Sequence, residues 1–487
     1  MSEPLKICYA ASEIRPFVKT GGLADVSADL PRALHRRGHD LRVFMPLYSQ
    51  IDTTAHELHP VDFAQNVPVE FGGRSYRFSL RTLSGPPSAL ATYLVDCPEL
   101  FHRDSIYTSD RDEPHRFLLF SRAVLESCQR MGWSPNLFHC NDWHTGLIPL
   151  LLRTVYDWDR LFHGSRTLFT IHNLGYQGLF PDSVIPQLGL GDWTRLFDQR
   201  ELEAGHMSFL RTALIYADGL STVSPTYARE IQTPEHGMGL DDLLRARRSS
   251  LVGILNGVDY SDWSPERDAL IPHRFSRKRL DGKRKNKLHL LREAGLSEAP
   301  DAPLIGIVSR LAPQKGFDLC FEVLPRLLAR SDLRLSVLGS GESEYERFFQ
   351  ELRNAFPDRV AYYRGYSERL AHLIEAGSDM FLMPSRYEPC GLNQMYSLRY
   401  GTIPIVRATG GLADTVRLFN PRTGEGTGIV FEHFRPDALE RAMRHALALY
   451  RQPELWKRMV QNAMQCDYSW SHQAELYVEI YNRLTRR

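Results

Sequence analysis

The chain has 487 residues, 43% of them hydrophobic and 24% charged, which is the composition of a globular protein large enough for two domains. Lysine and arginine total 59 against 58 acidic residues, and this balance excludes the basic excess typical of nucleic-acid-binding proteins. No run of 18 apolar residues occurs, so we expect no membrane-spanning segment and no membrane partner.

In the first half of the chain, short apolar segments alternate with helical patterns. An apolar run at residues 5–10 is followed by a glycine turn and a helical pattern that continues to Gly38. Residues 41–45 then predict a second strand, which makes a strand–helix–strand unit. Later apolar runs extend the alternation and favour a doubly wound parallel sheet; they lie at residues 137–139, 167–171 and 219–223.

The same alternation starts again in the second half. A strand at residues 304–308, a helix at 317–330 and a strand at 333–338 are predicted, with further buried strands at 380–383 and 403–406. The basic stretch at 273–287 is interpreted as an exposed connection, and residues 468–484 as a terminal helix. We therefore predict two Rossmann-like α/β domains with a boundary near residues 257–263.

The cysteines and the N-terminus bear on the compartment. Seven cysteines are scattered along the chain without a C-x-x-C pair, which disfavours a disulfide framework. The first residues, MSEPLKICYAASEIRP, lack the basic and apolar regions of a signal peptide. We expect a cytoplasmic protein.

One phrase, T-G-G-L-A-D, occurs twice, at residues 20–25 and 409–414. Each copy follows a strand-like segment and begins a helix. Glycines there let the backbone approach a ligand, and a helix N-terminus offers unpaired N–H groups. Turns also use glycine for conformational reasons alone, but the repetition favours a site for a phosphate or a sugar oxygen at both copies.

Charged residues follow two strands of the second half. Arg310 and Lys315 come after the strand at 304–308, where ligands bind in an open α/β sheet, and they suit a diphosphate. The alternative is a surface pair on a loop. Glu388 follows the strand at 380–383 and can bind sugar hydroxyls, complement a helix dipole, or do both.

Three further motifs resemble metal-binding or dinucleotide-binding sequences only in part. Residues 139–144 contain two histidines, a cysteine and an aspartate, but their spacing matches no zinc motif, so hydroxyl recognition together with residues 170–173 is favoured. The D-W-D sequence at 157–159 falls in a helical pattern that begins near Leu147 and is interpreted as an exposed helix face. The fragment at 339–341 lacks the third glycine of a dinucleotide fingerprint, which disfavours an NAD-dependent oxidoreductase.

In their order along the chain, these motifs resemble those of bacterial glycogen and starch synthases, which are retaining glucosyltransferases with the GT-B fold. The resemblance implies two Rossmann-like domains that face each other across a cleft and close on the donor, excluding water. It also implies the domain assignment: residues 1–258, joined by a C-terminal helix at 468–487, form the acceptor domain, and residues 259–467 bind the nucleotide sugar. The matching motifs are K-T-G-G-L-A-D-V from Lys19, N-D-W-H from Asn141, T-I-H-N from Thr170, N-G-V-D from Asn256, S-R-L from Ser309, K-G from Lys315, E-P-C-G-L from Glu388 and T-G-G-L from Thr409.

The activity implied is transfer of glucose from ADP-glucose to the non-reducing end of glycogen or another α-1,4-glucan primer, with retention of configuration. Some relatives use UDP-glucose, and no metal or other cofactor is expected. By position, Arg310 and Lys315 would hold the diphosphate, and Tyr366 would stack on the nucleobase. The implied catalytic residues are Glu388, His172, Asp142, Arg310 and Lys315. The implied donor-binding residues are Lys19, Gly21, Gly22, Asp25, Asn173, Asn256, Tyr366, Cys390, Gly391, Leu392, Asn393, Thr409, Gly410 and Gly411.

The chain departs from wider patterns at two positions. Tyr396 stands eight residues after Glu388, where many GT-B families, though not glycogen synthases, have a second glutamate; Asn393 stands where threonine is expected. Because Glu388 has no evident carboxylate partner, we expect front-face transfer in which the leaving phosphate helps to deprotonate the acceptor. A GT-B enzyme with a small acceptor and a non-catalytic glucan-binding relative remain as alternatives. The donor base, oligomeric state, allosteric control and glucan length stay open.

Overall fold

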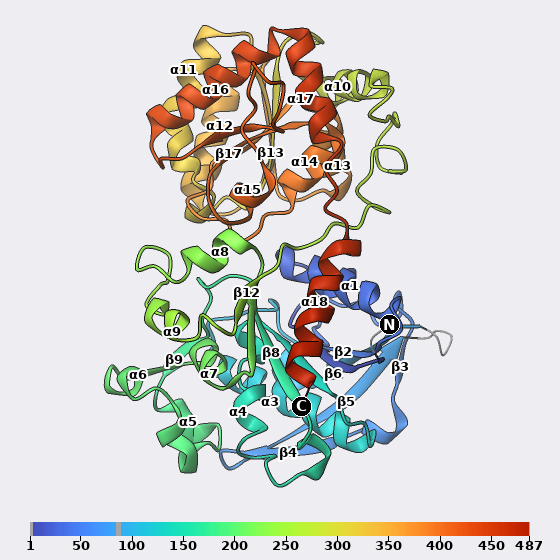
Figure 1. The fold of residues 1–487 in the computed structure, drawn as a ribbon, viewed down its shortest axis with the longest axis vertical. Helices are drawn as coiled ribbons and strands as arrows, with labels where there is room; N and C mark the ends of the chain where they lie inside the picture. The colour runs from blue at the N-terminus through green and yellow to red at the C-terminus, as the bar shows by residue number, and fades with distance from the viewer. Residues whose placement is uncertain (1–2, 84–88, 487) are drawn as a thin grey trace. The chain divides into compact units, whose positions relative to one another are not determined.

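The protein is described from a computed structural model that covers residues 3–83 and 89–486 (Figure 1). Its contacts divide it into two compact units. The first comprises Met1–Val223, Ala228–Gly257 and Trp470–Arg487, and the second comprises Ser224–Tyr227 and Val258–Ser469. The N-terminal part of the first unit thus ends at Gly257, one residue before the predicted limit at 258. The short segment Ser224–Tyr227, which belongs to the second unit, has no counterpart in the division predicted from the sequence.

The first unit is built on a ten-stranded sheet in the order β12-β11-β8-β7-β1-β2-β6-β5-β3, with β4 paired to β5. The strands β12 to β6 along this order are parallel, whereas β3, β4 and β5 form an antiparallel extension that was not predicted. The strand order reverses at β1, which lies between β2 and β7, so the loops after β1 and β7 border a topological switch point. The strands are β1 Lys6–Ala10, β2 Asp40–Pro46, β3 Leu58–Pro60, β4 Val67–Phe71, β5 Arg74–Leu83, β6 Ala91–Asp96, β7 Leu137–Asn141, β8 Arg166–Ile171, β11 Gly219–Thr222 and β12 Leu251–Gly253, beside a small pair of β9 Leu179–Pro181 and β10 His206–Ser208.

Helices of the first unit pack on this sheet through apolar faces. In α1, Leu23, Val26, Leu30 and Leu34 recur at helical spacing and are buried. The terminal helix α18 packs beside α1 in the first unit, where the Tyr481 hydroxyl lies 2.8 Å from Nδ1 of His139 (Figure 1). The helices are α1 Gly22–His35, α2 Pro98–Phe101, α3 Glu113–Arg130, α4 Ile148–Leu151, α5 Val184–Gln187, α6 Gln199–Glu203, α7 Phe209–Tyr216, α8 Pro225–Glu230 (which continues from the second unit), α9 Asp241–Ala246 and α18 Trp470–Thr485.

The second unit has a six-stranded sheet in the order β15-β14-β13-β16-β17-β18, and every pair in it is parallel. Relabelled in chain order this is 3-2-1-4-5-6, the Rossmann arrangement, with its switch point between β13 and β16. The prediction of two doubly wound α/β domains is confirmed. The strands are β13 Leu304–Val308, β14 Arg334–Gly339, β15 Val360–Arg364, β16 Met380–Met383, β17 Ile403–Arg407 and β18 Ile429–Phe431. The helices are α10 Asp281–Glu293, α11 Cys320–Arg330, α12 Ser343–Ala355, α13 Glu368–Gly377, α14 Asn393–Tyr400, α15 Gly410–Thr415, α16 Pro436–Tyr450 and α17 Pro453–Ala463.

Two local predictions were wrong. The basic stretch at 273–287 is not simply an exposed connection, because α10 begins within it and buries Lys287, whose Nζ donates to Asp379 at 2.5 Å. The D-W-D sequence at 157–159 is not helical, because α4 ends at Leu151 and the Asp159 side chain instead accepts the N–H of Leu161. Aspartate competes in this way for backbone donors outside helices.

No helix in the two described ranges has both the length and the apolar character needed to cross a bilayer. All seven cysteines fall within those ranges, and none forms a disulfide.

Candidate functional site

The second unit carries its predicted site residues at the switch point of its sheet. The β13 strand ends at Val308, just before Arg310 and Lys315, and β16 ends at Met383, just before the loop that holds Glu388. Ligands of open α/β sheets bind in the crevice outside the carboxyl ends of the strands at such a point. The topology therefore brings these residues to the place where this fold binds its ligands.

Lys315 and Glu388 form the central contact of this site. The Lys315 Nζ donates to both carboxylate oxygens of Glu388, at 3.0 and 2.7 Å, and the Ser385 hydroxyl donates to the same carboxylate at 2.9 Å. Glu388 is only 5% exposed. A buried carboxylate needs a counter-charge and hydrogen bonds of this kind. The residue predicted to bind glucose and the residue predicted to bind phosphate thus touch each other.

Amide side chains at the start of α14 join the neighbouring loops. Asn393 donates from Nδ2 to the carbonyl of Val308 at 2.6 Å, which fastens α14 to the end of β13. Gln394 donates to the carbonyls of Cys390 and Gly391 at 3.0 and 2.9 Å. The asparagine that departs from the expected threonine therefore links the Glu388 loop to the strand that precedes Arg310.

The second T-G-G-L-A-D copy packs against the Glu388 loop. Gly410 has a φ of +44°, and a Cβ there would lie 1.9 Å from the carbonyl oxygen of Glu388. A Cβ on Gly411 would lie 2.1 Å from the carbonyl oxygen of Cys390. The Gly411 N–H donates to the Glu388 carbonyl at 3.1 Å. Close backbone packing explains both glycines, and Thr409 before them is buried.

Close packing also explains the glycines at 339–341. A Cβ on Gly339 would lie 2.1 Å from the Ser309 carbonyl oxygen, and one on Gly341 would lie 2.1 Å from that of Leu311. The fragment of a dinucleotide motif is therefore a backbone support for the Arg310 loop.

The first T-G-G-L-A-D copy has different surroundings. A Cβ on Gly21 would meet nothing within 4 Å, and its φ of −159° suits any residue. The N–H groups of Thr20 and Gly21 donate to the carboxylate of Glu13, at 2.5 and 3.3 Å. Lys19 Nζ lies 2.7 Å from Asp25 in the first turn of α1. A carboxylate of the chain itself thus occupies backbone donors that were expected to bind a ligand.

The two copies give a matched prediction. Gly21→Ala should fold like the wild type, within about 0.5 kcal/mol, because the new methyl group enters open space. If a ligand approaches this glycine, activity should fall at least about tenfold. Gly411→Ala should lower the free energy of unfolding by about 2–4 kcal/mol, because its methyl group meets backbone. Thermal unfolding and donor turnover of both variants test this, and full activity of Gly21→Ala would contradict a ligand there.

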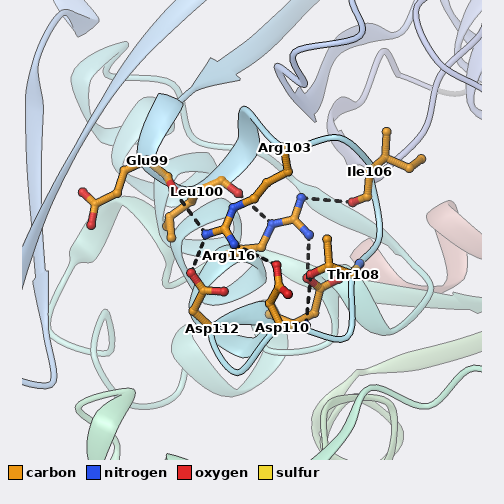
Figure 2. Close-up of polar contacts among 9 residues, drawn as sticks. Glu99, Leu100, Arg103, Ile106, Thr108, Asp110, Asp112 and Arg116 are labelled. Atoms are coloured by element: carbon orange, nitrogen blue, oxygen red, sulfur yellow. Dashed lines mark hydrogen bonds and ion pairs between the residues drawn. The ribbon is translucent and has the colours of Figure 1, made fainter.

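Two arginines clamp the loop between α2 and α3 (Figure 2). Arg116 is fully buried and donates to the carbonyls of Leu100 and Ile106, at 2.7 and 3.0 Å, and to the carboxylate of Glu113. Arg103 binds the carboxylates of Asp110, at 2.9 Å, and Asp112. Charge-assisted bonds of this kind hold a loop in one conformation.

This clamped loop carries Tyr107 to the first glycine loop. The Tyr107 hydroxyl donates to Glu13 at 2.6 Å, and its ring stacks on His144 with centroids 4.6 Å apart. Glu13 in turn holds Thr20. Sequence reasoning missed Glu13, Tyr107 and Ser385. Glu13 follows β1 as Asp142 follows β7, and that position was a signal; Tyr107 lies in a polar loop without a recognisable pattern.

Asp142 is held in a strained, buried position at the end of β7. It has a φ of +55°, which is rare for a residue other than glycine and is typical of functional sites. Its Oδ1 accepts the N–H of His172 at 2.7 Å and that of Asn173 at 3.4 Å. Burial nevertheless raises the pKa of Asp142 to about 7, so its charge changes near neutral pH.

His172 is neutral, and its tautomer follows from its neighbour. Burial lowers the pKa of His172 to about 3. Its Nε2 lies 2.9 Å from Oδ1 of Asn141, whose Nδ2 already donates to the Ala10 carbonyl. The amide oxygen must therefore accept, so Nε2 carries the proton and Nδ1 is left as an acceptor. Such a nitrogen suits a sugar hydroxyl.

The remaining predicted residues are spread over other loops. Arg310 is exposed after β13, and Tyr366 is 62% exposed after β15. Cys390 is buried, with Gly391 and Leu392 leading into α14. In the first unit, Asn256 is buried, and within the described residues its Oδ1 makes no hydrogen bond. The structure groups Arg310, Lys315, Glu388 and residues 390–393 with 409–411, whereas Tyr366 lies on a separate loop.

The histidine-rich segment is a structural network. His139 is fully buried, with Tyr481 on one ring nitrogen and the Thr170 hydroxyl, at 2.7 Å, on the other. Among residues 3–83 and 89–486, no group of three or more histidine, cysteine, aspartate or glutamate side chains is placed to hold a metal ion.

Comparisons with family models agree with these two units. Residues 6–246 match the model of the starch synthase catalytic domain, and residues 293–465 match that of glycosyl transferases group 1. In structure, the chain is similar to the catalytic domain of starch synthase IV from Arabidopsis thaliana bound to ADP and acarbose. The TM-score is 0.92 at 33% sequence identity, and both chains are fully covered.

Whole-chain relatives point the same way. The glycogen synthase of Koribacter versatilis (strain Ellin345) is 47% identical over 484 residues, which cover 98% of each chain. The glycogen synthase of Anaeromyxobacter dehalogenans (strain 2CP-C) is 47% identical over 486 residues, covering 99% of this chain and 100% of the relative. The chain therefore belongs to the bacterial glycogen synthase family of GT-B glycosyltransferases.

Proposed function

We propose that this protein is a glycogen synthase that transfers glucose from ADP-glucose to the non-reducing end of an α-1,4-glucan with retention of configuration. The observation that carries the proposal is the Lys315–Glu388 contact at the switch point of the second sheet. It supplies a cation and a hydroxyl-binding carboxylate side by side, as a sugar joined to a diphosphate requires.

The proposed chemistry assigns the growing charges to particular groups. Breaking the bond between glucose and phosphate builds negative charge on the diphosphate, which Lys315, Arg310 and the N-terminus of α14 would stabilise. Fixed groups of this kind lower the barrier most in a site that excludes water. In the first unit, Asp142 would stabilise positive charge on the sugar, and Nδ1 of His172 would accept a hydrogen bond from a sugar hydroxyl. We assign acceptor binding to the first unit and nucleotide-sugar binding to the second.

Retention would follow from front-face transfer. Glu388 is already bound by Lys315 and Ser385, which supports a binding role over that of a nucleophile. A double-displacement glycosidase would need a second carboxylate about 5 Å away. The leaving phosphate would then take the proton of the acceptor hydroxyl. Trapping a glucosyl group on Asp142 or Glu388 would refute this route.

We further propose that the transfer needs no metal, because Lys315 and Arg310 can supply the counter-charge for the diphosphate. Partners would be ADP-glucose and a glycogen or glucan primer, without nucleic acid or membrane. The absence of disulfides among the seven cysteines supports a cytoplasmic location.

Glucose incorporation into glycogen from ADP-glucose and UDP-glucose, measured in parallel with and without EDTA, tests the proposal. We expect ADP-glucose to be the better donor and EDTA to have no effect. Preference for UDP-glucose would correct the donor, and loss of activity in EDTA would correct the metal assignment. A folded protein that binds glucan but incorporates glucose from neither donor would refute the function.

A further inference from the structure

One tryptophan in the segment that follows Gly257 is sandwiched between two rings of the second unit. The Trp263 ring stacks on His372 with centroids 3.7 Å apart and an interplanar angle of 18°. On its other side it stacks on Tyr396 at 3.9 Å and 3°. Such parallel contacts on both faces leave the indole little freedom.

The two partner rings come from two different helices that begin near predicted donor contacts. His372 lies in α13, which begins at Glu368, just after the exposed Tyr366. Tyr396 lies in α14, which begins at Asn393, just after the Glu388 loop. Each ring is about one helical turn inside its helix. The indole therefore lies between the two helices about one turn from the ends that follow Tyr366 and the Glu388 loop, where the nucleobase and sugar-phosphate contacts are proposed.

A buried polar contact fixes the same two helices to the tryptophan segment. Asp268, five residues after Trp263, accepts from Nδ1 of His372 at 2.8 Å and from the Tyr400 hydroxyl at 2.5 Å. Tyr400 is the last residue of α14. All three of these side chains are buried. Residues 263–268 thus bind α13 and α14 together through stacking at one point and hydrogen bonds at another.

We propose that Trp263 is a positioning residue whose indole sets the spacing between α13 and α14. This spacing in turn sets the distance between Tyr366, which would stack on the nucleobase, and the Glu388 loop. The ligand that spans both is a nucleoside diphosphate sugar, so the proposal rests on the proposed function and deepens it. It also gives Tyr396 a role: in place of a second glutamate, this position provides one face of the sandwich.

A residue that sets the spacing between two helices affects one substrate selectively, which a residue of the general core does not. A ligand held at both ends binds less tightly when the distance between its contacts changes, and a misplacement near 1 Å can also slow the reaction about 10²-fold. A substrate that touches neither helix keeps its affinity. Loss of general packing would instead lower stability without favouring one substrate.

Steady-state kinetics of Trp263→Leu separate these cases. We expect the KM for ADP-glucose to rise at least about tenfold, with the KM for glycogen within about twofold of the wild type. Trp263→Phe and Tyr396→Phe each keep an aromatic ring at the changed position. Their KM for ADP-glucose should therefore stay much closer to the wild-type value than that of Trp263→Leu. Phe348→Leu is the matched control: this half-buried ring in α12 also has two aromatic neighbours, Phe321 and Phe349 at 4.7 and 5.1 Å, but lies outside α13 and α14.

An unchanged KM for ADP-glucose in Trp263→Leu would overturn the proposal, as would an equal rise in Phe348→Leu. If Trp263→Leu does not fold, Tyr396→Leu removes one face of the sandwich and must raise the same KM. The wild type is measured first: if it neither uses ADP-glucose nor binds ADP, the proposed function fails and this inference with it. If the wild type binds ADP and Trp263→Leu keeps the wild-type KM for ADP-glucose, the spacing role of Trp263 is refuted and the proposed function is not.

Discussion

Replacing Lys315 by alanine is expected to lower kcat for glucose transfer by roughly 10³-fold, because the substitution removes the cation beside the leaving diphosphate. The same change leaves the carboxylate of Glu388, 5% exposed, with the Ser385 hydroxyl, at 2.9 Å, as its one remaining side-chain donor among residues 3–83 and 89–486. An uncompensated buried charge costs about 3 kcal/mol of stability. Single-turnover transfer from ADP-glucose and urea unfolding of the same preparation measure the two effects separately.

A double variant separates catalysis from stability. Glu388→Gln removes the buried charge, so Lys315→Ala combined with Glu388→Gln should unfold at a higher urea concentration than Lys315→Ala alone. Its activity should stay low, because the cation is still missing. Arg386→Ala is the matched control: this arginine lies in the same loop as Glu388, but its side chain pairs with Asp318 at 3.0 Å. It should retain wild-type kcat. Recovery of activity in the double variant would show that Lys315 acts only as a counter-ion for Glu388.

The fold was predictable where strands are buried on both faces. The segments 304–308 and 380–383 are continuous apolar runs, and the structure places β13 and β16 at those residues. The antiparallel extension was missed because β4 and β5 alternate buried and exposed residues, and short strands of this kind give a weak local signal.

Part of the site could be predicted from the sequence, because the carboxyl ends of parallel strands lie at the same edge of a sheet. Arg310, Lys315 and Glu388 were located in this way, and the structure puts Lys315 and Glu388 in contact. Contacts between distant loops could not be placed, since no local pattern specifies that Tyr107 meets Glu13, 94 residues away, or that Trp263 lies between His372 and Tyr396. The two T-G-G-L-A-D copies make the same point, because identical residues border open space at Gly21 and packed backbone at Gly411.

Replacing Asp142 by asparagine is expected to stabilise the first unit at pH 8 while lowering kcat at least about 10²-fold. Burial raises the pKa of Asp142 from 3.8 to about 7, so between these values the folded state holds a proton that the unfolded chain has released. The free energy of unfolding therefore falls as pH rises through this window, by about 4 kcal/mol in total. Asparagine has no such proton, yet its side-chain oxygen can still accept the N–H of His172.

Thermal unfolding of both proteins between pH 4 and pH 8 tests the stability effect, because every other titrating group cancels in the difference. The variant and the wild type should unfold at similar temperatures near pH 4, and the stability gained by the variant should grow up to about pH 7 and then level off towards pH 8. Asp157→Asn, which changes an exposed acid of the same unit, should follow the wild type at every pH. In the wild type, kcat should rise with pH through about 7 as Asp142 ionises, and the variant should lack this rise. A variant that loses stability at pH 8, or that keeps the wild-type pH profile of kcat, would contradict a strained, titrating carboxylate at this position.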